Sequence, residues 1–189
     1  MNGKAIILSA PSGSGKTTIV RCLMEANPEL SFSISATTRA PRGSERDGVD
    51  YHFLTPDQFR NKIDAGEFIE WEEVYQGTYY GTLRAAIEGI WAQGKNVIFD
   101  VDVKGGVNLK RFFGERALSV FVKAPSLDAL RERLIARGTE SPESLERRLR
   151  KAGDELAFEP QFDVTIVNDN KENACRKALE LYGELKGRV

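Results

Sequence analysis

The chain has 189 residues, of which 41% are hydrophobic and 29% charged, and its 27 basic and 28 acidic residues nearly cancel. This balance excludes disorder by composition and argues against a general nucleic-acid coat protein, which would carry a basic excess. Two cysteines and one histidine are too few for a disulfide framework or a zinc cluster. No apolar run approaches the length of about 18 residues typical of a membrane span. We therefore expect a cytoplasmic protein with neither a membrane nor a nucleic-acid partner.

Short apolar runs alternate with longer amphipathic stretches along the chain. The runs lack polar alternation, as in strands that are covered on both faces of a parallel sheet. They lie at residues 4–9, 96–100, 118–123 and 164–168. A helical pattern over residues 17–25 follows the first run, helical segments follow the next two, and a closing helix is expected over 171–185. This alternation predicts an α/β fold, a doubly wound parallel sheet flanked by helices.

Two segments interrupt this alternation. Residues 33–82 contain Thr/Arg/Pro/Gly-rich turns, short β-like runs and one helix starting at Thr55-Pro56, which together predict an inserted α+β lobe. Residues 126–157 predict a helical hairpin with Ser126 and Ser141 as helix caps. We expect both segments to belong to one domain that spans all 189 residues. Its core would comprise residues 1–32, 83–125 and 158–189.

A glycine-rich loop follows the first predicted strand and opens the first predicted helix. It reads APSGSGKT from Ala10 to Thr17, in the strand-to-helix context that a phosphate-binding P-loop requires. Glycines let backbone N–H groups wrap a polyphosphate, while Lys16 would bridge the β- and γ-phosphates and Thr17 would ligate Mg²⁺. The alternative is a glycine-rich turn that binds nothing. The predicted ATP contacts in this segment are Ala10, Pro11, Ser12, Gly13, Ser14, Gly15, Lys16, Thr17 and Thr18.

The first position of this loop departs from the general P-loop pattern, which has glycine where this chain has Ala10. Alanine is tolerated there if its backbone keeps a negative φ, because its Cβ disfavours positive φ. We therefore expect negative φ at Ala10. The P-loop alone indicates ATP or GTP and does not identify the reaction.

Beyond the loop, the sequence resembles the guanylate kinases, which phosphorylate GMP from ATP. The resemblance extends from about Lys4 to the final helix, and its motifs are specific in combination. They are Ser12–Thr17 (SGSGKT), Ser35–Arg42 (SATTRAPR), Gly48–Tyr51 (GVDY), Glu67–Trp71 (EFIEW), Tyr79–Thr82 (YYGT), Asp100–Asp102 (DVD) and Arg137–Thr139 (RGT). The resemblance implies a P-loop NTPase-type core, a GMP-binding insert, a mobile helical lid, and the reaction ATP + GMP = ADP + GDP with Mg²⁺ as cofactor. It places the protein in purine nucleotide metabolism.

Four residues of the insert suit one phosphate group. Arg39 and Arg42 are three residues apart around a proline and would grip a phosphate from two sides. Tyr51 and Tyr80 would add hydroxyl donors without adding charge. The resemblance assigns all four to the GMP phosphate. The alternative for the two arginines is a solvated surface pair.

Glu70 is the candidate for recognition of the base. Guanine offers adjacent N1–H and N2–H donors that a carboxylate can accept, whereas adenine would leave that carboxylate unpaired. The resemblance adds hydroxyl contacts to the base from Ser35 and Thr82, the latter to guanine O6. The alternative for Glu70 is an exposed charge on a strand.

Asp100 and Asp102 follow the predicted strand over 96–100, where acidic residues face the ligand crevice of an α/β sheet. We assign both to the GMP site, and Asp100 also to magnesium through a water molecule. One of the two carboxylates would hold the metal and the other would orient an arginine or the base, with the roles left open. The family usually has glutamine at the position of Lys104, so the contacts of this lysine are open as well.

Arginines of the helical hairpin resemble lid residues of the family. Arg133, Arg137 and Arg148 would neutralise the charge that develops during phosphoryl transfer, alongside Lys16. Each of them is alternatively part of a solvated helix face. Asn168 follows a strand, at a place that the family uses near the adenine of ATP.

Two other functions compete with an ATP:GMP phosphotransferase. One is a guanylate-kinase-like module that binds phosphopeptides without catalysis, although the intact Lys16-Thr17 argues against it. The other is a P-loop kinase of a phosphosugar, against which Glu70 and Thr82 argue. We expect ATP and GMP as small-molecule partners, and a monomer or a homodimer.

Overall fold

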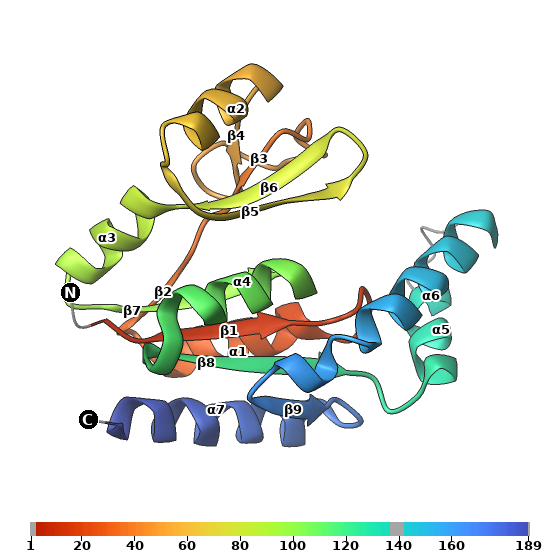
Figure 1. Cartoon of the computed structure of the whole chain (residues 1–189). Helices are drawn as coiled ribbons and strands as arrows, with labels where there is room; N and C mark the ends of the chain where they lie inside the picture. Colours follow the sequence, from red (N-terminus) through yellow and green to blue (C-terminus); the bar gives the residue numbers. More distant parts are fainter. Residues whose placement is uncertain (1–2, 137–141, 189) are drawn as a thin grey trace.

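A five-stranded parallel sheet forms the centre of the computed structural model, which describes residues 3–136 and 142–188. The strand order is β2-β7-β1-β8-β9, and every neighbouring pair is parallel. The strands are β1 (Ala5–Ser9), β2 (Leu30–Phe32), β7 (Asn96–Val101), β8 (Ala117–Lys123) and β9 (Val164–Val167). Helices cover both faces of the sheet (Figure 1). The α/β fold with a parallel sheet flanked by helices is therefore confirmed.

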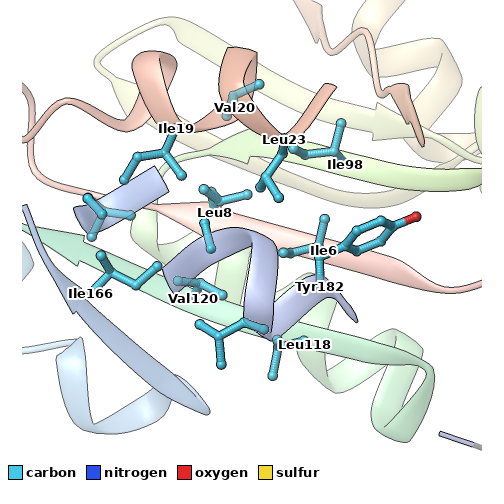
Figure 2. Packing of buried hydrophobic residues seen from close by; sticks show 14 of the residues in the cluster. Ile6, Leu8, Ile19, Val20, Leu23, Ile98, Leu118, Val120, Ile166 and Tyr182 are labelled. Carbon is cyan, nitrogen blue, oxygen red and sulfur yellow. The ribbon is translucent and has the colours of Figure 1, made fainter. Parts of the chain in front are cut away.

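Alternate residues of the central strand point into two separate cores. Ile6 and Leu8 pack against α1 (Lys16–Ala26) and α7 (Lys171–Gly187), as Figure 2 shows for the larger cluster. Ala5 and Ile7 face the second cluster, which includes residues of α3 (Arg84–Ala92) and α4 (Val103–Phe113). Burial on both faces explains why this strand is apolar at nearly every position.

A second sheet of four strands lies apart from the central one (Figure 1). Its order is β4-β3-β6-β5, with β3 and β4 parallel and the other two pairs antiparallel. The strands are β3 (Ala36–Thr37), β4 (His52–Phe53), β5 (Phe68–Tyr75) and β6 (Thr78–Leu83). Helix α2 (Pro56–Asp64) covers this sheet through Phe59, which stacks on Phe68. The side chain of Thr55 accepts from the backbone of Gln58 and the side chain of Gln58 accepts from the backbone of Thr55, so the predicted helix start carries a capping box.

Two helices form a hairpin at the end of the central sheet where the P-loop lies (Figure 1). They are α5 (Leu127–Ala136) and α6 (Pro142–Leu156), and they pack through Leu130, Leu134 and Ala152. Ser126 caps α5, because its Oγ accepts from the backbone N–H of Ala129. The predicted cap Ser141 lies outside the described residues.

The structure adds elements that the apolar pattern did not predict. Strand β2 has three residues and pairs with β7 at the sheet edge, and β3 has two, so neither has a measurable periodicity. Helix α3 was also not predicted. Two short 3₁₀ segments, Gly114–Arg116 and Glu159–Gln161, precede β8 and β9. No helix within residues 3–136 and 142–188 is long and apolar enough to cross a membrane.

Candidate active site

A hollow of about 360 Å³ opens where β1 and β7 end. The P-loop lines one side of it, and residues of the second sheet line the other. Carboxyl ends of parallel strands are the usual place for ligands in α/β folds. The hollow is lined by the whole segment 10–18 and by the predicted GMP-site residues Ser35, Tyr51, Glu70, Tyr80, Asp100 and Asp102.

The P-loop has the conformation that its glycines permit. Gly13 and Gly15 have φ values of 96° and 90°, which side-chain-bearing residues rarely adopt. No described residue other than glycine has a positive φ, so Ala10 keeps the negative φ that the sequence predicts. A Cβ on Gly15 would lie 2.2 Å from Nδ2 of Asn168. The loop therefore requires glycine at this position for two separate reasons.

Asn168 lies beside the P-loop. Its Nδ2 donates to the backbone carbonyl of Ser14 over 2.7 Å, and its own backbone carbonyl accepts from Nη2 of Arg133 over 2.7 Å. With Arg133 it also lines a second hollow of about 490 Å³ on the outer side of the loop. Asn168 thus holds the loop in shape, a contact that the sequence did not predict.

Lys16 points towards the end of β7. Its Nζ forms an ion pair with Oδ1 of Asp100 over 2.7 Å and donates to the carbonyl of Val101 over 2.7 Å. Thr17 is exposed at the start of α1 and lines the same hollow. A hydroxyl and a carboxylate are oxygen ligands of the type that Mg²⁺ prefers. Thr17 and Asp100 therefore fit a magnesium ion, with Asp100 acting through a water molecule.

Arg39 lies among the residues predicted for the GMP phosphate. Its guanidinium makes two hydrogen bonds to Glu45, of 2.8 and 3.0 Å, and its Nε donates to the hydroxyl of Tyr80 over 3.1 Å. The ring of Tyr51 lies 5.1 Å from the guanidinium carbon. Glu45 raises the pKa of Arg39, and burial raises the pKa of Tyr51. These groups keep Arg39 charged and positioned at the lobe.

Arg42 does not join Arg39 through its side chain in this structure. It is exposed, and the part that enters the cluster is its backbone N–H, which donates to Oε2 of Glu45 over 2.8 Å. The three-residue spacing thus brings both arginines to one carboxylate rather than side by side.

Glu70 is a buried carboxylate, with 9% of the residue exposed. The hydroxyl of Thr82 donates to its Oε1 over 2.7 Å, because the two residues are partners across β5 and β6. Burial raises the pKa of Glu70 to about 7, and the neighbouring charges of Asp102 and Glu72 contribute. The alternative interpretation of Glu70 as an exposed strand charge is therefore wrong.

Asp102 has a structural contact that the sequence did not predict. It is the N-cap of α4, and its Oδ1 accepts from the backbone N–H groups of Lys104 and Gly105. A Cβ on Gly105 would lie 3.1 Å from Oε2 of Glu70, so the start of α4 packs closely against this carboxylate. Lys104 is exposed.

Of the predicted lid arginines, Arg133 and Arg148 belong to the described part of the chain, and Arg137 lies outside it. Arg133 holds the carbonyl of Asn168, as described above. Arg148, on α6, donates from Nη1 to Oγ of Ser12 over 3.4 Å. Helix α6 therefore contacts the P-loop through Arg148.

Some residues of this site carry no signal in the sequence. Glu45 is an acid six positions after Arg39, and Tyr75, Lys151 and Glu155 line the hollow without belonging to a motif. Their positions depend on the packing of distant elements, so a pattern along the chain could not identify them.

The parallel sheet, the P-loop and the facing lobe define a nucleotide kinase of the P-loop class. A profile of the guanylate kinase family matches residues 2–183, so the chain belongs to that family. It is 55% identical to a guanylate kinase of Bacteroides thetaiotaomicron over 184 residues, covering 97% of this chain and 90% of the relative. It is 51% identical to a guanylate kinase of Salinibacter ruber over 174 residues, covering 92% of each.

Solved structures agree with this assignment. The crystal structure of guanylate kinase from Anaplasma phagocytophilum matches with a TM-score of 0.80 and 27% identity, covering 99% of this chain and 88% of that one. A shikimate kinase from Bacteroides thetaiotaomicron matches with a TM-score of 0.50 and 13% identity, covering 98% of this chain and 99% of that one. The second likeness shows the fold alone.

Proposed function

We propose that this protein transfers the γ-phosphoryl group of ATP to GMP, forming ADP and GDP. One observation carries the proposal: a buried carboxylate suited to guanine faces an intact P-loop across a single hollow. A binding module would need neither Lys16 nor the loop geometry around it.

Glu70 and Thr82 are the proposed readers of the base. The carboxylate of Glu70 accepts from guanine N1–H and N2–H, and the hydroxyl of Thr82 turns from Glu70 to guanine O6. Ser35 lines the same hollow and adds a hydroxyl. Adenine presents an acceptor where guanine presents N1–H, so a buried Glu70 would lose its partners with AMP.

Arg39 is the proposed main ligand of the GMP phosphate. In the free protein Glu45 occupies two of its guanidinium donors, and a phosphate carries more charge than a carboxylate. The phosphate therefore competes for these donors while Tyr80 and Tyr51 supply hydroxyl groups. Arg42 is exposed and adds a second guanidinium as the lobe closes.

The P-loop is the proposed ATP site. Backbone N–H groups of residues 10–18 wrap the phosphates, and Lys16 leaves Asp100 to bridge the β- and γ-phosphates. Thr17, with Asp100 through water, would hold Mg²⁺, which supplies charge neutralisation for the polyphosphate. The adenosine lies in the outer hollow, beside Asn168 and Arg133.

Transfer needs no general base from the protein, because the acceptor oxygen already belongs to a phosphate dianion. What the protein must supply is positive charge around the transferring group and exclusion of water. Arg133, Arg137 and Arg148 of the lid are the proposed sources of that charge, together with Lys16. We propose that the lid, about residues 126–157, and the lobe, about 33–82, close over the core of residues 1–32, 83–125 and 158–189.

A coupled assay of ADP formation with GMP, AMP, CMP and UMP tests the proposal. We expect magnesium-dependent turnover with GMP that exceeds turnover with the other three by orders of magnitude. Lys16→Met is the inactive control. Equal rates with all four nucleotides, or no turnover with GMP, would contradict the proposal.

A further inference from the structure

A lysine outside every recognised motif reaches the reaction hollow from the lid. Lys151 lies on α6, three residues after Arg148, and lines the same hollow as Lys16. We propose that Lys151 is a further catalytic residue, whose ammonium group contacts the phosphoryl group during transfer. This proposal rests on the proposed function and adds a residue to it.

Lys151 is held between the lobe and the P-loop side of the hollow. Its Nζ lies 4.1 Å from the ring centroid of Tyr75, at the end of β5, and 3.8 Å from Oε1 of Glu155. Glu155 is buried and lines the same hollow as Ser12 of the P-loop. Lys151 therefore lies between Tyr75 of the lobe and Glu155 of α6, in the hollow that the P-loop also lines.

The charges that line the hollow favour such a group. Its lining carboxylates are Glu70, Asp100, Asp102 and Glu155. Within residues 3–136 and 142–188, the lysine and arginine side chains that line it are those of Lys16 and Lys151. Two nucleotides bring several further negative charges into this space, and positioned cations must offset them as charge shifts between the phosphates. Lys151 is already in place for that task.

Both contacts of Lys151 are weak enough for a phosphate group to displace them. The side chain is 34% exposed, and an ion pair of 3.8 Å between residues four apart on a helix is weak. The cation–π contact uses Tyr75, which is itself exposed. Lysine has a flexible stem and three donors, so Nζ can leave both partners without any movement of the helix.

The step itself leaves Lys151 chemically unchanged. An oxygen of the GMP phosphate forms the new bond to the γ-phosphorus, the bond from that phosphorus to the β–γ bridging oxygen breaks, and its electron pair leaves with ADP. The ammonium group keeps its three protons and donates hydrogen bonds to oxygens of the group in transfer.

Steady-state kinetics of three variants test the proposal. We expect Lys151→Met to lower kcat about 10- to 100-fold, with KM for ATP and for GMP each within about threefold of the wild type. Lys151→Arg should recover most of the loss, because it restores a cation at the same site. Arg150→Met is the matched control, since it removes one positive charge from the exposed face of the same helix. We expect its kcat to stay within about twofold of the wild type.

Other outcomes would overturn the proposal. An unchanged kcat in Lys151→Met would show that the lysine forms only a surface ion pair. A raised KM at constant kcat would show that it binds the substrate in the ground state alone. Failure of Lys151→Arg to recover activity, with unfolding temperatures equal to the wild type, would also contradict a role through charge. Turnover of GMP by the wild type tests the proposed function separately, because that activity does not depend on the role assigned to Lys151.

Discussion

Replacing Glu70 by glutamine should stabilise the free protein while weakening its action on GMP. The carboxylate is buried, receives one hydrogen bond from Thr82 and lies near the charges of Asp102 and Glu72. A glutamine side chain at this position would keep the shape and still accept from Thr82, but it carries no charge to desolvate. The substitution therefore has opposite effects on the free energy of unfolding and on the activity with GMP.

The magnitude follows from the pKa of Glu70. Burial raises it from an ordinary value of 4.5 to about 7. Between these values the folded protein binds more protons than the unfolded chain, so the free energy of unfolding falls as pH rises through this window. The full penalty, on the order of 3 kcal/mol, is present above about pH 7 and disappears below about pH 4.5. Glu70→Gln should lack this dependence.

The activity of the variant should change in the other direction. Ionised Glu70 accepts two guanine donors, whereas the glutamine amide accepts one and sets a donor against the other. Loss of a hydrogen bond to a charged partner and an unpaired buried group together cost about 3–5 kcal/mol, or roughly 10²- to 10⁴-fold in kcat/KM for GMP. AMP, whose N1 can accept from the new amide, should lose little. For the wild type, kcat/KM for GMP should fall as pH drops below about 7, because the protonated acid no longer accepts from both donors.

The assay combines two measurements on both proteins. Thermal unfolding without ligand at about pH 5.5 and about pH 8 gives the pH dependence of stability, and kcat/KM for GMP and AMP gives the specificity. The GMP phosphate titrates with a pKa of about 6 in both cases, so the difference between the pH profiles of the two proteins isolates Glu70. The same pH dependence of unfolding in both proteins, or an unchanged GMP/AMP ratio, would refute this reasoning.

Three further changes test other parts of the site. Lys16→Met should lower kcat about 10³-fold or more at saturating substrates, measured by ADP formation, and near-normal turnover would remove Lys16 from the mechanism. Ala10→Gly should leave the affinity for ATP almost unchanged but lower the free energy of unfolding by about 0.4–1 kcal/mol, because the unfolded chain gains freedom where φ is already negative. Small-angle scattering should show a smaller radius of gyration with GMP and a non-hydrolysable ATP analogue than without ligand, and identical radii would contradict closure of the lobe and lid.

The sequence predicted the central sheet well because its strands are buried on both faces. The run at 4–9 is apolar without polar alternation, which is typical of a strand buried on both faces. The structure explains this through the two cores on either side of β1. The same reasoning fails for β2 and β3, which are too short to show a period. Their strand conformation comes from pairing with β7 and β6, and tertiary contacts of this kind are not encoded in a local pattern.

The candidate site likewise contains residues that the sequence predicted and contacts that it could not predict. Lys16 and Glu70 lie in motifs whose chemistry could be argued from the residue types, and the structure brings them to one hollow. The contacts that Asn168 makes with the P-loop could not be predicted, because they join residues 154 positions apart. The bonds between Arg39 and Glu45 span only six residues, yet a turn of unknown shape separates them in the sequence.

Each of the three cations that we propose as phosphate ligands has a carboxylate partner in the free protein. Lys16 pairs with Asp100, Arg39 with Glu45, and Lys151 with Glu155. In each pair the carboxylate offsets the positive charge of its partner in the free protein. On the proposed function, a substrate phosphate replaces the carboxylate as the partner of each cation. Phosphate succeeds in this exchange because it carries more charge and more acceptor oxygens than a carboxylate.

This arrangement also accounts for the composition of the chain. A protein that binds two polyanionic nucleotides has a formal net charge of −1. The proposed phosphate-binding cations have carboxylate partners in the same chain, so no basic excess appears in the total. A net charge near zero therefore argues against a general coat protein for long anionic polymers but is compatible with binding of small anions in a hollow with paired cations.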